Sequence, residues 1–294
     1  MAFTLKIRSE ELGKTKTIDF KRILSNCSLE FGENDEFYIL RESKLSNGSA
    51  VLYNPKRIGR GIFFDGNNAG EGEITINYNI PTTASEIKDF INVAKEIEVQ
   101  LGRVTMFCEE EEREYTSKML DENMDNMIAF SVKSLNEFCC NTDYKTYIFT
   151  LAMFPWFLPQ NKVDEYKSCD NLDDFEETLH GLQALDLYYA KPSVMRNGQT
   201  GQIAAFYTLT EDCPSVFPVA ANMFLNLDNI KIDQGFIRFY IFSEKRPLEG
   251  FYDYNEFIEL LLKEKKAGIF DANHIVVPSL SKKDIEELVG KLVR

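Results

Sequence analysis

The chain has 294 residues, of which 44% are hydrophobic and 27% are charged, so it can bury one large core or two modest ones, and disorder is excluded. Its formal net charge of −14 repels phosphate backbones and argues against general DNA or RNA binding. We therefore expect a globular protein with no nucleic acid partner.

The amino end and the apolar stretches show no export or membrane signal. Residues 1–9 alternate apolar and polar side chains, and Lys6 and Arg8 precede any long hydrophobic run, so we expect no signal peptide. The longest apolar run, residues 147–158, is shorter than the roughly 20 residues of a membrane-spanning helix and contains Pro155. Six scattered cysteines without a C-x-x-C motif are typical of reduced thiols. These features predict a cytoplasmic protein with no membrane partner.

The first half of the chain begins with strand-like segments and continues with two helices. Alternation of apolar and polar residues predicts strands over residues 3–8, 36–41, 61–65 and 73–79. Thr83 and Glu86 have the spacing of a capping box, in which the threonine hydroxyl accepts from the Glu86 backbone and the glutamate reaches back to the first free donor. The apolar stripe that follows, up to Leu101, predicts a helix, and a second apolar face predicts another over residues 117–140.

The second half alternates strands and helices irregularly. The apolar and strand-prone runs predict strands over residues 147–154, 203–209, 236–242 and 275–277, and helical spacing predicts a third helix over residues 172–182. Asp253 is the expected cap of a fourth helix, and Ser281 with Asp284 forms a capping box that opens a terminal helix. Arg238 is expected to make a structural ion pair if it faces inward, or to lie on the solvent face of its strand.

These elements predict an α+β protein with two closely packed lobes, each a mostly antiparallel or mixed sheet covered by helices. We place the lobes at residues 1–141 and 142–294. No linker rich in Pro, Gly or Ser divides them. Each half contains a strand, a capped helix and an acidic helix, which a distant duplication would explain, although no residue-level repeat accompanies it.

Most of the negative charge lies in two short segments. Residues 109–125 carry eight acids against Arg113 and Lys118, and residues 164–177 carry seven acids against Lys167, so each segment has a net charge of −6. Two interpretations stay open. The acids belong to solvated helix faces, or they form surfaces that meet a basic protein partner, as inhibitor and immunity proteins do.

Few residues are suited to catalysis. The chain has only two histidines, and Glu177-x-x-His180 is a single metal-binding pattern where bundle-type di-iron sites need two; His274 follows Asp271 at the same spacing in an expected loop. Cys139 and Cys140 are expected to be packed thiols, with redox sensing as the alternative. No Walker A or G-x-S-x-G motif is present. We therefore expect no metal and no cofactor, predict no catalytic residue, and leave open whether the protein is an enzyme.

One loop is strictly basic in this acidic chain. Residues 54–61 contain Lys56, Arg57 and Arg60 and no acid, with Gly59 and Gly61 between them. The glycines permit close backbone approaches, and the three cations, if gathered on one edge, would hold the carboxylate or phosphate of a small anionic ligand. The alternative is an edge loop whose cations neutralise the acidic regions of the protein itself. Small-ligand binding by an enzyme or sensor is thus the second functional hypothesis, beside a protein-interaction module.

At this loop, at Asn79-Ile80-Pro81-Thr82-Thr83 and at Gly235–Tyr240, the sequence resembles a bacterial family known only as a domain of unknown function, found mainly in low-GC Gram-positive bacteria. The similarity extends over most of the chain. The resemblance implies a bacterial cytoplasmic protein and adds no catalytic residues.

Overall fold

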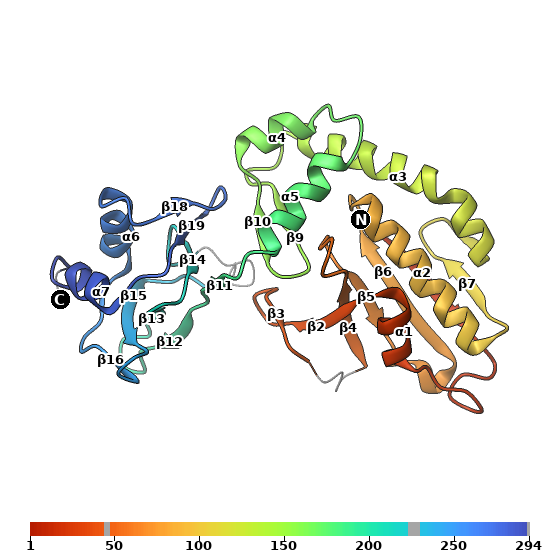
Figure 1. Cartoon of the computed structure of the whole chain (residues 1–294), viewed down its shortest axis with the longest axis horizontal. Coiled ribbons are helices and arrows are strands. Elements are labelled where there is room, and N and C mark those ends of the chain that lie inside the picture. The colour runs from red at the N-terminus through yellow and green to blue at the C-terminus, as the bar shows by residue number, and fades with distance from the viewer. Residues whose placement is uncertain (44–47, 223–229, 293–294) are drawn as a thin grey trace. The chain divides into compact units, whose positions relative to one another are not determined.

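The computed structural model of the chain describes residues 1–43, 48–222 and 230–292 (Figure 1). The chain divides into two compact units, Met1–Leu185 and Asp186–Arg294. Helices are combined with several antiparallel or mixed sheets, so the predicted α+β class is confirmed. The boundary drawn from the sequence, between residues 141 and 142, falls inside the first unit, directly after α3 (Ser117–Cys140).

The first unit is built on an eight-stranded antiparallel sheet with strand order β3-β2-β4-β5-β6-β1-β7-β8. Its strands are β1 (Ala2–Arg8), β2 (Glu30–Asn34), β3 (Leu40–Arg41), β4 (Ser49–Tyr53), β5 (Ile62–Asp65), β6 (Glu73–Asn79), β7 (Thr105–Cys108) and β8 (Arg113–Tyr115). β1 lies between β6 and β7, with Leu5 opposite Ile76 on one side and Cys108 on the other. Strand β6 has the predicted bounds.

The strand predicted over residues 36–41 is wrong in its first part. Residues 35–39 form a turn in which the Asp35 carboxylate accepts hydrogen bonds from the backbone of Phe37 at 2.8 Å and of Ile39 at 3.1 Å. Tyr38 in this turn has φ of +59°, so only Leu40–Arg41 remains extended. A local side chain thus competes with the sheet for backbone donors.

Three helices accompany this sheet: α1 (Phe20–Cys27), α2 (Ala84–Leu101) and α3; Figure 1 shows α2 running along the sheet beside β6. α2 buries its predicted stripe, including Ile87, Phe90 and Ile97, in the same core as Leu5 and Ile7 of β1. Each such side chain contributes about 1.5–3 kcal/mol by leaving water. Burial of the stripe therefore fixes which face of α2 meets the sheet.

The capping box predicted for α2 is only half present. The Thr83 hydroxyl accepts from the backbone of Glu86 at 3.1 Å, as expected. The Glu86 carboxylate does not return to the cap but accepts from the Gly61 backbone at 2.6 Å and from the Thr82 hydroxyl. The Gly61 backbone, from another segment, therefore takes the place of the Thr83 backbone as a donor to Glu86.

The first unit ends with a hairpin and two helices: β9 (Ile148–Thr150), β10 (Pro155–Phe157), α4 (Gln160–Tyr166) and α5 (Asp173–Gln183). The single strand predicted over residues 147–154 is corrected, because the chain reverses after Thr150 and Pro155 pairs back with it. Trp156 and Phe149 are both buried in this hairpin.

The second unit contains two mixed sheets and two helices. One sheet has the order β11-β14-β19-β18, and the other has the order β12-β13-β15-β16 with β17 also paired to β15. The elements are β11 (Tyr188–Tyr189), β12 (Ser193–Arg196), β13 (Ile203–Thr210), β14 (Ser215–Pro218), β15 (Gln234–Ile241), β16 (Arg246–Pro247), β17 (Tyr252–Asp253), α6 (Tyr254–Lys263), β18 (Gly268–Ile269), β19 (His274–Val277) and α7 (Lys282–Val289). Asp253 caps α6, and Ser281 with Asp284 forms the predicted capping box of α7. Within the described residues, no helix is long and apolar enough to cross a bilayer.

Gly235 in β15 provides a test of packing in the second unit. A Cβ atom there would lie 2.3 Å from the Cβ of Ala221 and 3.0 Å from that of Tyr254. Gly235→Ala should therefore lower the free energy of unfolding by about 1–3 kcal/mol, measured by urea denaturation. The matched control is Gly198→Ala, where a Cβ meets nothing within 4 Å. Equal stability of the two variants would contradict this packing.

Candidate functional site

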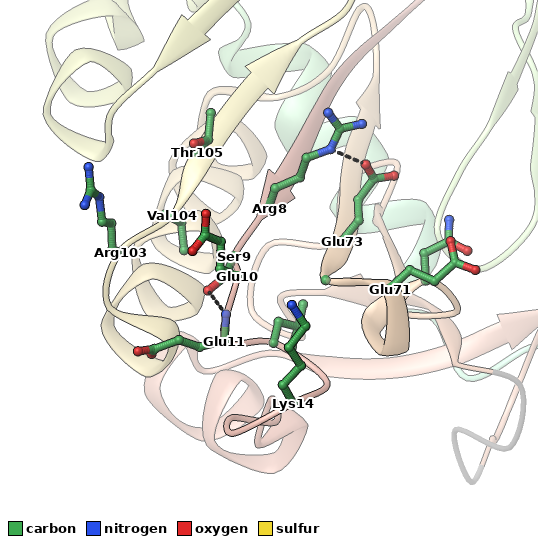
Figure 2. Close-up of a pocket in the computed structure, with 13 residues that line it drawn as sticks. Arg8, Ser9, Glu10, Glu11, Lys14, Glu71, Glu73, Arg103, Val104 and Thr105 are labelled. Carbon is green, nitrogen blue, oxygen red and sulfur yellow. Dashed lines mark hydrogen bonds and ion pairs between the residues drawn. The ribbon is translucent and has the colours of Figure 1, made fainter.

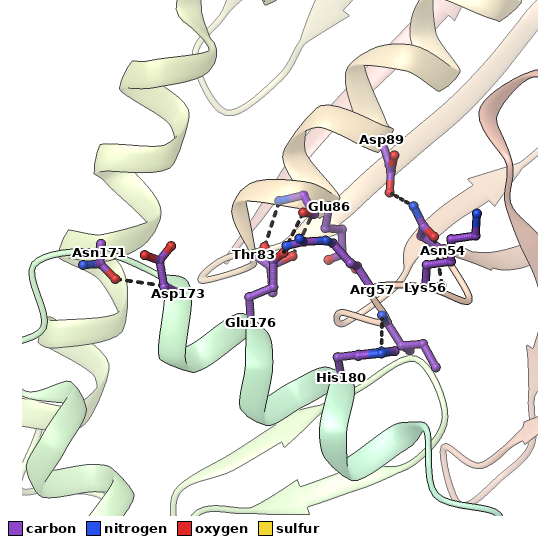
Figure 3. Close-up of polar contacts among 12 residues, drawn as sticks. Asn54, Lys56, Arg57, Thr83, Glu86, Asp89, Asn171, Asp173, Glu176 and His180 are labelled. Atoms are coloured by element: carbon purple, nitrogen blue, oxygen red, sulfur yellow. Dashed lines mark hydrogen bonds and ion pairs between the residues drawn. The ribbon is translucent and has the colours of Figure 1, made fainter.

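The basic loop, residues 54–61, connects β4 to β5 and begins with the turn that its Asn-Pro pair predicts. The Asn54 side chain accepts from the Lys56 backbone at 3.0 Å, and its amide donates to Asp89 of α2 at 3.1 Å. Figure 3 shows the loop beside the start of α2 and the side chains of α5. The loop is therefore positioned by two helices, one of them far away in sequence.

Arg57 pairs with a carboxylate of the protein itself. Its Nη1 lies 2.5 Å from Oε1 of Glu176 on α5 (Figure 3). Glu176 is buried and also accepts from Ser85, from the backbone at 3.0 Å and from the hydroxyl at 2.6 Å. Burial works to raise the pKa of Glu176, but the bonds from Ser85 and Arg57 hold that pKa below its usual value. Arg57 thus links the loop to α5.

Arg60 points into the protein and is only 7% exposed. Its Nη1 donates to the carbonyl of Pro81 at 2.9 Å and its Nε to the carbonyl of Thr150 at 3.1 Å, while its guanidinium lies 4.9 Å from the ring centre of Phe149. Burial lowers the pKa of Arg60 to about 10, against the opposing charge of Glu86. Arg60 therefore holds β9 and the start of α2 to the loop.

The three predicted ligand residues do not share one surface. Lys56 is exposed and makes no side-chain hydrogen bond or ion pair to a described residue, Arg57 is exposed but paired with Glu176, and Arg60 is buried. The pairing of Arg57 agrees with the alternative interpretation, in which the loop neutralises acids of the protein. A ligand-binding role for these residues stays a prediction.

The two glycines of the loop lie close to the carboxylate of Glu86. The Gly61 backbone donates to Oε2 of Glu86 at 2.6 Å, with φ of +90° at Gly61, and a Cβ on Gly59 would lie 2.4 Å from the same oxygen. Glu86 is only 4% exposed, and burial raises its pKa. The glycines therefore allow close approach of an internal carboxylate, which the sequence alone did not reveal.

His180 is engaged with the same loop. Its Nδ1 accepts from the Ile58 backbone at 3.2 Å, and Gln183 one turn later donates to the Gly59 carbonyl at 2.8 Å. Glu177-x-x-His180 thus places its histidine against the protein backbone. Among the described residues, no group of three or more His, Cys, Asp or Glu side chains gathers in a way that could hold a metal ion.

The remaining candidates of the sequence differ in burial. His274 is buried, with Nδ1 2.9 Å from Asp271 and Nε2 2.8 Å from the Tyr189 hydroxyl. Cys139 is buried, and burial raises the pKa of its thiol to about 12, whereas Cys140 is exposed. Arg238 lies on the solvent face of β15 and donates to the Thr208 hydroxyl at 3.0 Å.

A hollow of about 900 Å³ lies at the other end of the first sheet, where β1 ends and β7 begins. Figure 2 shows acids and bases alternating around it, with Arg8 donating to Glu73 at 2.6 Å. Glu10, Glu11, Lys14 and Arg103 also line it. This mixture of charges favours no one class of ligand.

The chain belongs to the family described as Domain of unknown function (DUF4299), whose pattern matches residues 2–288. No curated protein and no solved structure matches the chain. The resemblance to a family of unknown function is therefore confirmed.

Arg60→Ala should lower the free energy of unfolding by about 3–5 kcal/mol, because the carbonyls of Pro81 and Thr150 lose their donor and Glu86 loses its compensating charge. Lys56→Ala, in the same loop but exposed, should change it by less than about 0.5 kcal/mol. Chemical denaturation of both variants gives the comparison. Similar losses in the two variants would show that Arg60 is not a structural cation.

Glu86→Gln should change the pH dependence of stability. The raised pKa means that folded Glu86 holds its proton more tightly than unfolded Glu86, so its contribution to stability falls as the pH rises from the usual glutamate pKa through the raised value. The unfolding free energy of the wild type minus that of the variant should therefore decrease as the pH rises above about 4.5, the usual pKa of a glutamate. A difference that is constant or grows with pH would contradict the buried titration.

Proposed function

We propose that this member of the family is a non-enzymatic bacterial cytoplasmic interaction protein, whose acidic surface on the first unit binds a basic protein partner. The observation that carries the proposal is the exposure of all eight acids of residues 109–125, here called the acidic segment. The segment spans the turn after β7, strand β8 and the start of α3. Eight carboxylates on one short stretch create a field that attracts a positively charged surface.

Pairing within the protein offsets only part of this charge. Lys6 pairs with Glu109, Lys95 with Asp121 at 2.6 Å, and Lys118 lies 3.4 Å from Glu122. Three further acids make no side-chain hydrogen bond or ion pair with any residue in the described part of the chain: Glu112, Glu114 and Asp125. These three are the carboxylates best placed to meet cations of a partner.

The other acidic segment, residues 164–177, is less suited to a partner. Its Glu176 is buried against Arg57, Lys167 pairs with Asp164 at 2.8 Å, and Lys162 lies 2.6 Å from Asp174. Much of this charge is therefore neutralised by ion pairs inside the first unit.

The first unit as a whole holds 32 acidic against 20 basic residues, so it carries −12 of the net −14.

Two further features support the non-enzymatic and cytoplasmic parts of the proposal. Both histidines are engaged in internal hydrogen bonds rather than in a nucleophile–base arrangement. All six cysteines lie in described segments as free thiols, which suits a reducing compartment.

The alternative function, binding of a small anionic ligand at Lys56, Arg57 and Arg60, has narrower support. Of these three residues, Lys56 alone is both exposed and without a side-chain partner among the described residues. A lone exposed lysine is a weak anion site. We therefore rank it second.

Reversal of three acids tests the main proposal. The variant Glu112→Lys, Glu114→Lys and Asp125→Lys should lose the proteins that the wild type captures from a bacterial lysate at low salt. It should also bind a fluorescent nonalysine peptide at least about tenfold more weakly, measured by anisotropy. Wild-type binding should weaken as salt rises, because exposed charges are screened.

A matched variant distinguishes the effect of the position of the reversed acids from the effect of the changed net charge. Asp186→Lys, Glu249→Lys and Glu259→Lys changes the same number of exposed acids outside the acidic segment. It should retain the captured proteins and most of the peptide affinity. An equal loss of captured proteins and of peptide affinity in both variants would refute the assignment to the acidic segment. So would a wild type that captures no protein at low salt.

A further inference from the structure

A second hollow in the first unit, of about 670 Å³, is lined mainly by apolar and aromatic side chains, and we call it the aromatic pocket. It lies among the start of β1, the end of β6, the β7–β8 hairpin and α3. Its apolar lining includes Phe3, Tyr78, Ile80, Tyr115, Met127 and Phe130. This volume and composition are those of sites that bind small molecules, which occupy roughly 300–1,000 Å³.

The aromatic rings of the pocket are held in place by one another. The Phe3 ring stacks on Tyr78 at 5.6 Å and meets Tyr115 edge-on at 6.0 Å. All three residues are buried, so their rings are fixed in the core before any ligand arrives. Phe130, at 44% exposure, stands at the open side. Rigid rings lose little conformational entropy on binding, which favours a specific ligand.

The two phenols of the pocket differ in their hydrogen bonds. The Tyr115 hydroxyl donates to Glu111. Tyr78 is only 2% exposed, yet its hydroxyl makes no hydrogen bond to another residue within the described ranges. Among the described residues, the one buried side-chain nitrogen or oxygen without a hydrogen-bond partner is Oδ1 of Asn34, so the Tyr78 hydroxyl is not a buried unsatisfied group.

The charge around the pocket selects the kind of ligand. Glu110 and Glu111 line it, and the rest of the acidic segment adjoins them. Arg113 is the one basic side chain of the lining, and its guanidinium lies 5.1 Å from the ring centre of Tyr115. Aromatic faces attract cations and repel anions, and Phe130 is the exposed ring of the lining.

From these observations we infer that the aromatic pocket binds a small organic cation, an ammonium or guanidinium ion attached to an apolar body. The apolar body packs against Phe130 and Met127, and the charged group lies near Glu110 and Glu111. This site goes beyond the proposed partner interaction and does not depend on it, because a free cation would bind whether or not the acidic segment docks a protein.

Three probes that share a phenyl ring test the inference. The full-length protein is titrated by calorimetry with phenethylamine, a cation, with phenylacetate, an anion, and with neutral benzyl alcohol. Phenethylamine should bind saturably and at least about tenfold more tightly than phenylacetate. Comparable binding of phenylacetate, or no saturable binding of phenethylamine, overturns the inference.

Variants locate the binding and its charge preference. Phe130→Ala should weaken phenethylamine binding by about three- to tenfold, and the matched control Phe242→Ala, a phenylalanine with 66% exposure in the second unit, should not. Glu111→Gln should weaken phenethylamine while leaving benzyl alcohol unchanged. An unchanged affinity in Phe130→Ala or Glu111→Gln, or an equal loss in Phe242→Ala, overturns the inference. Because the probes are small molecules, this result is independent of the partner-capture experiment.

Discussion

The arrangement of the basic loop depends on one buried carboxylate, that of Glu86 at the start of α2. A carboxylate removed from water costs several kcal/mol unless hydrogen bonds and an opposite charge compensate it. The Gly61 backbone and the Thr82 hydroxyl supply the hydrogen bonds, and Arg60 supplies the charge. The loop must therefore lie against the helix, and Gly59 must lack a side chain where it passes the same oxygen.

This constraint explains why an acidic chain contains a strictly basic loop. Arg60 turns inward to carbonyls around Glu86, and Arg57 turns to Glu176 on α5, so two of the three cations meet acids or carbonyls of the first unit. His180 and Gln183 bind the backbone of the loop from the same helix. The loop thus joins the large sheet, α2 and α5, and its positive charge has a structural role.

The acidic segment shows the opposite behaviour, which is why both binding proposals concern it. Its carboxylates lie at the surface, where hydration stabilises their charge. The lysines that pair with them are too few to neutralise them. The aromatic pocket opens beside these acids, so its rings and the surrounding field favour the same sign of charge. A protein surface and a small cation would therefore exploit one electrostatic feature in two ways.

The sequence by itself determined the elements whose signals are local: α2 and α3 from their apolar stripes, the caps Thr83, Asp253 and Ser281, and strand β6. It missed α1, β2 and β4, and it missed the reversal after Thr150, because no short-range pattern distinguishes a buried hairpin from one strand. Only the tertiary structure decided what Arg57 and Arg60 do, since their partners lie 119 and 90 residues away in the chain. Local periodicity records which face of an element is apolar, whereas the partner of a charged side chain is chosen by packing between distant segments.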